Sequence, residues 1–239
     1  MKFHAAPYRR LHIACLALVT SALVATTSAF AGLPQARQGQ EDAATSVGVL
    51  PPQAKPRGYS LADIGKITAA FNVSDHSGSS IPLPTEVDGS RKIQMLYTTA
   101  TNTFYASQGT FFYVPILTPD DSPPILGTFP NINDRNAVVN YFYSAQQLGL
   151  QYAIITIDGQ AFSLDERYIA AVRVPPLPDG GGTGYLPVAA FVKPLKKGTH
   201  TVEISGNVTG AAVPPWCEAV GFSCPDGFSF SITYTVVVR

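Results

Sequence analysis

The sequence is poor in charged residues. Only 13% of its 239 residues are Asp, Glu, Lys or Arg, and 16 basic residues balance 16 acidic ones. Without a surplus of positive charge the chain has no electrostatic footprint for nucleic acid. Its 46% of hydrophobic residues is too high for a disordered chain, and its 20 glycines and 20 prolines are too many for a helical bundle. The composition therefore favours a globular fold of strands and turns.

The short motifs of common enzymes are also missing. The sequence has no G-x-S-x-G, no H-E-x-x-H and no D-x-D-x-D-G calcium loop. The glycine-rich segment 180–184 lacks the lysine of a phosphate-binding loop. No His and Cys residues have the spacing of a zinc site. We therefore expect no metal and no cofactor, and we favour a protein without catalytic activity.

The first 31 residues have the pattern of a secretory signal peptide. Lys2, Arg9 and Arg10 make a positive start, an apolar run follows over 11–24, and Ala29-Phe30-Ala31 fits a small-x-small cleavage site. The apolar run is too short to span a bilayer. We expect cleavage after this segment, a secreted or periplasmic location, and no membrane span in the mature chain.

Cleavage changes both the charge and the cysteine count. The mature chain keeps 13 basic and 16 acidic residues, a formal net charge of −3. It also keeps two cysteines, Cys217 and Cys224, which are expected to form a disulfide in an oxidising compartment. Residues 32–57 contain no aromatic side chain and are rich in Gln, Ala, Pro and charge, which predicts a disordered tether. No linker-like stretch divides 58–239, so we expect a single domain there.

Hydrophobic patterning predicts strands over most of this domain. Residues 229–238 and 199–205 alternate between apolar and polar, as strands with one buried face do. Residues 110–117 and 152–157 are apolar on both faces, which is typical of central strands. Weaker strand patterns cover 92–98 and 168–174.

Two helices are expected between the strands. Ser60 and Asp63 have the spacing of a capping box, and an apolar repeat follows to Phe71. A second helix is expected to begin after Asn133 or Asp134 and to end at Gly149. Short strands, Gly and Pro turns and two inserted helices predict a mainly β fold, an antiparallel β-sandwich of the immunoglobulin-like or jelly-roll-like kind. A β-barrel is the alternative.

Three segments carry a resemblance to a protein family. They are NTFYASQGTFFYVPIL (102–117), ITIDGQ (155–160) and FVKPLKKGTHTVEISG (191–206). Their order resembles a group of uncharacterised secreted bacterial β-rich proteins with an aromatic "PaG-x-x-x-FFPV" strand and a late "PL-x-pGTHTI" hairpin. The resemblance covers about residues 90–210. It implies a secreted β fold and brings no activity with it.

Paired carboxylates give the first candidate site. Asp120 and Asp121 directly follow the strand expected over 110–117. Such a pair can bind Ca²⁺ through its oxygens, or act as acid and base on a glycosidic bond. The plainer interpretation is a solvated turn before Pro123 and Pro124.

The second candidate site is the loop of the expected disulfide. Trp216 precedes Cys217, and Phe222 lies between the two cysteines. Displayed aromatic rings can stack on a sugar or anchor a partner. Alternatively, Trp216 covers the disulfide as part of a small core.

Three functions are compatible with these features. The first is a secreted or periplasmic non-catalytic module that binds an unknown extracellular or envelope ligand. The second is a secreted hydrolase, with carbohydrate as its candidate substrate, that uses Asp120 or Asp121. The third is a carrier of an apolar small ligand, which needs an internal cavity of roughly 300 Å³ or more.

Overall fold

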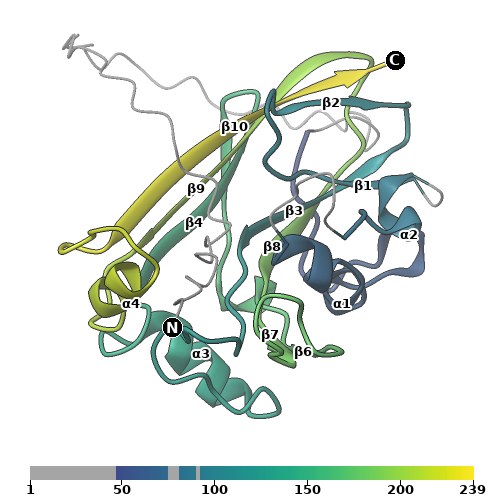
Figure 1. The fold of residues 1–239 in the computed structure, drawn as a ribbon. Coiled ribbons are helices and arrows are strands. Elements are labelled where there is room, and N and C mark those ends of the chain that lie inside the picture. Colours follow the sequence, from purple (N-terminus) through teal and green to yellow (C-terminus); the bar gives the residue numbers. More distant parts are fainter. Residues whose placement is uncertain (1–46, 75–80, 90–91) are drawn as a thin grey trace, which may run out of the picture.

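The fold is a β-sandwich, formed by two sheets that pack face to face around a common core (Figure 1). The computed structural model describes residues 47–74, 81–89 and 92–239. The predicted signal peptide and most of the predicted tether lie outside these residues. Neither sheet closes into a barrel, so the sandwich is the correct one of the two architectures.

The domain contains ten strands and six helical segments among the described residues. The strands are β1 (Ile93–Met95), β2 (Thr103–Ala106), β3 (Phe111–Leu117), β4 (Leu150–Ile157), β5 (Gln160–Ser163), β6 (Val172–Arg173), β7 (Gly184–Tyr185), β8 (Val188–Val192), β9 (Gly198–Val208) and β10 (Phe228–Val238). The α-helices are α1 (Leu61–Asn72), α2 (Thr85–Asp88), α3 (Arg135–Tyr143) and α4 (Val213–Ala219), and the 3-10 helices are η1 (Pro56–Gly58) and η2 (Glu166–Tyr168). Within the described residues, no helix is long and apolar enough to cross a membrane.

The larger sheet has five strands in the order β2-β10-β9-β4-β5, and the smaller has three in the order β1-β3-β8. Strands β6 and β7 form a separate two-stranded sheet. Most neighbours are antiparallel, as predicted, whereas β1 with β3 and β2 with β10 are parallel pairs. The segments expected over 92–98 and 168–174 form only the short strands β1 and β6, and η2 occupies part of the second segment.

The core lies between the two sheets. In β10 the alternate apolar residues from Phe230 to Val238 are buried, while Ser229, Ser231 and Thr233 are exposed. The smaller sheet is covered on both faces, because α1 packs against its outer side. Every residue of β8 is consequently buried.

The capping box of α1 is confirmed. The Ser60 hydroxyl accepts the Asp63 backbone N–H at 3.1 Å, and the Asp63 carboxylate accepts the Ser60 N–H at 2.8 Å. Ile64 and Phe71, on the buried side of the helix, belong to one cluster with Phe191 of β8. The helix thus attaches its apolar face to the smaller sheet.

The second predicted helix is shorter than expected. Asp134 caps α3 by accepting backbone N–H groups of the first turn, as predicted, but the helix ends at Tyr143. Gly149 has a φ of 58°, and a Cβ atom there would lie 2.6 Å from the backbone nitrogen of Gly210. This glycine therefore permits a close backbone crossing and does not end the helix.

A further helix, α4, was not predicted. The segment was expected to be a loop, but it forms a helix whose first turn contains Pro214 and Pro215. The first turn tolerates proline because its N–H groups have no partner within the helix. The predicted loop of the disulfide is therefore in part a helix.

The predicted tether over 32–57 is wrong at its C-terminal end. Val49 forms a β-bridge with Val192, and the Leu50 N–H donates to the Phe191 carbonyl at 2.7 Å. The Leu50 carbonyl accepts the Tyr168 hydroxyl at 3.1 Å. These backbone groups extend the edge at β8, so Val49 and Leu50 belong to the folded domain.

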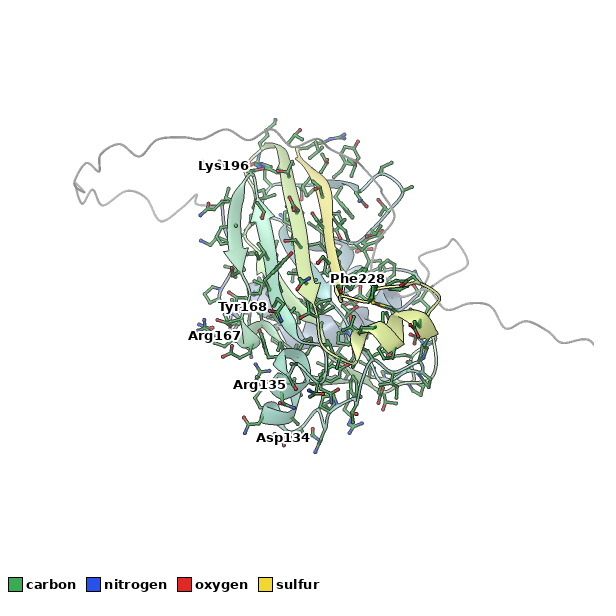
Figure 2. All side chains as sticks on the ribbon, turned by 90° about the vertical axis from the view of Figure 1, so that its left-hand side faces the viewer. Asp134, Arg135, Arg167, Tyr168, Lys196 and Phe228 are labelled. Carbon is green, nitrogen blue, oxygen red and sulfur yellow. A yellow bond between two sulfur atoms is a disulfide. The ribbon has the colours of Figure 1, made fainter. Side chains whose placement is uncertain are left out.

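A hydrogen-bonded pair, His200 and Asp158, joins β9 to the turn between β4 and β5. His200 Nδ1 lies 2.7 Å from Asp158 Oδ2, and His200 Nε2 lies 2.8 Å from the Lys196 carbonyl oxygen. Both partners accept hydrogen bonds, so the doubly protonated imidazolium satisfies both contacts. Burial lowers the pKa of His200, but the hydrogen bonds to Asp158 and Lys196 outweigh it and raise the pKa overall. Figure 2 shows Lys196 at the opposite end of the sheet from Phe228.

We expect this pair to make stability depend on pH. A raised histidine pKa gives stability that is fully present below the unfolded value near 6.5 and is lost as the pH rises through the folded value. Wild type should exceed His200→Gln in free energy of unfolding by about 1 kcal/mol at pH 5.5, and by less at pH 9. Urea denaturation of both proteins at the two pH values measures this. An equal difference at both values would contradict a charged histidine.

Candidate functional site

Asp120 and Asp121 point to different partners. Asp120 Oδ1 accepts the Ser122 backbone N–H at 2.7 Å, which closes a turn directly after β3. Asp121 Oδ1 accepts the backbone N–H groups of Thr183 at 2.6 Å and Gly184 at 2.8 Å. Asp121 therefore anchors the glycine-rich segment before β7, and the two carboxylates do not form one site.

A different carboxylate, Asp179, joins Asp120 instead. The Ser122 hydroxyl donates to Asp179 Oδ1 at 2.9 Å and accepts the Gly182 N–H at 3.2 Å. A Cβ atom on Gly182 would lie 2.5 Å from Asp121 Oδ1, so only glycine permits this approach. No local sequence pattern identified Asp179 as a site residue.

These carboxylates line a partly enclosed cavity of about 110 Å³ beside α4. Its polar end is made by Asp120, Ser122 and Asp179, and most of the remaining surface is apolar. The described residues that line it are Asn72, Val73, Ile116, Leu117, Thr118, Pro119, Asp120, Ser122, Pro123, Pro124, Leu126, Leu148, Asp179, Val208, Val213, Trp216, Val220 and Phe228. Figure 2 shows Phe228 at this end of the larger sheet, next to α4.

Asp120 has an unusual electrostatic environment. Burial raises the pKa of its carboxyl to about 6, although the Ser122 hydrogen bonds lower it, and the neighbouring Asp179 and Asp121 raise it further. Burial raises the pKa values of two phenols nearby, those of Tyr141 and Tyr185. The negative charge of Asp120 raises both pKa values further. The turn expected at Asp120 is present, but its carboxyl is half-buried and not fully solvated.

One of the two interpretations displayed Trp216 to solvent, but in the structure it is buried. Its side chain belongs to the main core, the residue is 7% exposed, and the indole N–H donates to the Pro124 carbonyl at 3.0 Å. Phe222 is 37% exposed, with its ring 6.1 Å from that of Trp216 and 5.8 Å from that of Phe228. The exposed ring of Phe222 thus contacts two rings, those of Trp216 and Phe228, that line the cavity.

The predicted disulfide between Cys217 and Cys224 is confirmed. Both cysteines are buried, and Cys217 lies in α4. The bond therefore ties α4 to the chain that leads into β10.

Removal of the Asp121 carboxylate should destabilise the segment that carries Asp179. Asp121→Ala leaves two backbone N–H groups without their acceptor, at a cost of about 2 kcal/mol in free energy of unfolding. Asp121→Asn keeps a carbonyl oxygen and should lose less than half of that. Urea denaturation and amide hydrogen exchange at Thr183 and Gly184 test this. Equal losses in both variants would show that the contacts do not depend on the acceptor.

Comparisons with known proteins yield little. No family model matches the chain, so its resemblance to secreted bacterial β-rich proteins stays a prediction. No curated protein sequence matches it either. Among solved structures, the cysteine protease inhibitor EhICP2 from Entamoeba histolytica has a TM-score of 0.26 and 19% identity, over 57% of this chain and 86% of that one. The solution structure of Amebosin has a TM-score of 0.23 and 10% identity, over 57% and 88%. At these TM-scores neither likeness assigns a fold or a function.

Proposed function

We propose that the protein is a secreted or periplasmic binding module without catalytic activity, and that its ligand enters the cavity beside α4. The observation that carries this proposal is the cavity itself, which is lined by both Asp120 and Trp216 although 95 residues separate them. An apolar cavity with a few convergent polar groups is the usual form of a ligand site.

The size of the cavity limits what can enter. About 110 Å³ is well below the roughly 300 Å³ that a whole apolar ligand requires. This volume suits one side chain of a partner or one end of a small molecule, which favours a binding module over a carrier.

A plug at the cavity mouth tests the proposal. Val220 lines the cavity and is half-buried, whereas the adjacent Ala219 is exposed and outside the lining. A small-molecule fragment screen by thermal shift should give hits that raise the melting temperature of wild type. Those hits should be lost in Val220→Trp and kept in the matched control Ala219→Trp. A screen without hits, or hits that survive in Val220→Trp, would count against a ligand in this cavity.

A hydrolase is the second candidate, because one observation favours it. A carboxyl pKa of about 6 suits a general acid at neutral pH, and Asp179 supplies a second carboxylate nearby. A panel of chromogenic glycosides and esters tests this function. Turnover that disappears in both Asp120→Asn and Asp179→Asn would establish it, and binding of fragments without turnover would favour the module.

Secretion has its own test. If residues 1–31 are a signal peptide, the exported protein begins at Gly32 and carries an oxidised pair of cysteines. Intact mass spectrometry of protein from the periplasm and the medium of the producing cells measures both properties. Retention of residues 1–31 in a cytoplasmic, reduced protein would contradict the location.

A further inference from the structure

We propose that the cavity beside α4 receives an alkyl cation, an apolar stem that ends in an ammonium or guanidinium group, with Asp120 as its counter-charge. This inference rests on the proposed binding function and specifies the chemistry of the ligand. A lysine or arginine side chain of a partner and a free alkylamine share this chemistry.

The polar end of the cavity is arranged to accept hydrogen bonds. Asp120 and Asp179 each accept one hydrogen bond from Ser122, and both bonds use an Oδ1 atom. Among the described residues, Ser122 is the one hydrogen-bond donor that contacts these two carboxylates. A carboxylate has acceptor capacity for several donors. An ammonium or guanidinium group brings donors only, so it complements this end of the cavity.

Among the described residues of the cavity lining, the charge of Asp120 has no partner of opposite sign. Among the described residues that form the lining, none is lysine, arginine or histidine. Asp121 and Asp179 add negative charge beside it. Because burial raises the pKa of Asp120 to about 6, its carboxylate is ionised but poorly solvated at neutral pH. A ligand cation would offset that cost, whereas an anion would add to it.

The walls fit the stem of such a ligand. Leu117, Val213 and Val220 supply aliphatic surface, and Trp216 and Phe228 supply aromatic surface. Alkyl chains pack against such walls, and aromatic faces attract cations within about 6 Å. A volume of about 110 Å³ suits a single stem.

A metal ion is the less suitable cation. Within the described ranges, no cluster of three or more His, Cys, Asp or Glu side chains is placed to hold one. Metal sites rely on several such ligands at short distances. An organic cation needs only the carboxylates and the apolar walls that are present.

The probes for the test differ only in their end group. Pentylamine carries the cation, 1-pentanol is its neutral counterpart and pentanoate its anionic one. Isothermal titration or NMR titration of the wild-type protein at pH 7.5 should rank pentylamine at least tenfold tighter than either of the others. A second arm compares pentylamine with the blocked peptide acetyl-Gly-Lys-Gly-amide. Tighter binding of the peptide identifies a protein side chain as the source, and tighter binding of pentylamine identifies a free amine.

Two variants separate the charge from the fold. Asp120→Asn keeps the shape of the side chain and should weaken pentylamine binding at least tenfold. Glu218→Gln makes the same charge change at an exposed position of α4 outside the lining, and it should stay within twofold of wild type. Thermal melts establish that both variants are folded.

The pH dependence of the wild-type protein gives a test without mutation. The titratable groups that face Asp120 are the carboxyls of Asp121 and Asp179 and the phenols of Tyr141 and Tyr185, and burial raises the pKa of both phenols. Protonation of Asp120 removes the counter-charge, while an alkylamine stays protonated. Affinity for pentylamine should therefore fall at least threefold from pH 7.5 to pH 5, and Asp120→Asn should show a flatter profile.

The outcomes distinguish this inference from the proposed function. If 1-pentanol or pentanoate binds as tightly as pentylamine, or if Asp120→Asn binds it as wild type does, the cation inference is wrong and the binding module stands. If fragments of every charge fail to bind in the cavity, both are wrong. Selective, pH-dependent binding of pentylamine that requires Asp120 supports both.

Discussion

Replacement of Trp216 by alanine is expected to lower the free energy of unfolding by about 3–5 kcal/mol. The residue is 7% exposed and packs in the main core. Its loss opens a void beside the cavity and leaves the Pro124 carbonyl without its donor. For a domain of this size the melting temperature should drop by roughly 6–20 °C. Differential scanning calorimetry and urea denaturation measure both quantities.

Two companion variants identify the cause. Trp216→Phe keeps much of the packing but loses the indole N–H, so about 1–2 kcal/mol should be lost. Phe222→Ala changes an exposed ring next to Trp216 and should cost less than about 1 kcal/mol. If Trp216→Ala costs no more than Phe222→Ala, then Trp216 is not a core residue. Because stability is expected to fall, Trp216→Ala is a poor probe of ligand affinity, and Asp120→Asn and Val220→Trp serve that purpose better.

Loss of the disulfide is expected to have the next largest effect. The double variant Cys217→Ala and Cys224→Ala opens a loop of about eight residues, for which the chain-entropy relation gives about 2.5 kcal/mol. The cost should appear first in α4, which the bond ties to the chain before β10. Urea denaturation should give the same loss for the double variant as for wild type under reducing conditions.

The effect on the cavity provides a second measurement. Val213, Trp216 and Val220 are cavity residues in or next to α4. Amide hydrogen exchange in α4 should therefore speed up in the double variant, while β9 and β10 keep their protection. Stability within 0.5 kcal/mol of wild type, with unchanged exchange in α4, would show that the helix does not depend on the disulfide.

Some parts of this structure were predictable because their signals are local. The alternation in β10 reports directly which side chains face the core, and the capping box at Ser60 depends on residues three apart. The disulfide was predicted from two cysteines in a chain whose first 31 residues have the pattern of a signal peptide. Local periodicity and spacing were sufficient for these features, since each depends on a few neighbouring residues.

Other parts depend on contacts between distant segments. A loop was expected where α4 forms, since sequence alone does not tell prolines in the first turn of a helix from prolines in a coil. Val49 and Leu50 are ordered because β8 offers them a free edge, which composition does not reveal. Tyr152 in β4 is 41% exposed, although its segment looked apolar on both faces, because no helix among the described residues covers that side of the larger sheet (Figure 1). Whether a strand residue is buried therefore depends on which other elements pack over its face of the sheet.

The candidate site shows the same division. The sequence by itself determined that the chain is poor in charge, builds a mainly β fold, and places paired aspartates after a buried strand and a tryptophan beside a disulfide, whereas the structure decided for a sandwich over a barrel. Only the tertiary structure decided that Asp121 is an anchor, that Asp179 joins Asp120 through Ser122, and that Trp216 forms part of the same cavity. The physical reason for this division is that the number of charged residues can be read from the composition alone. The cost of one buried charge depends on which distant side chains exclude water from it.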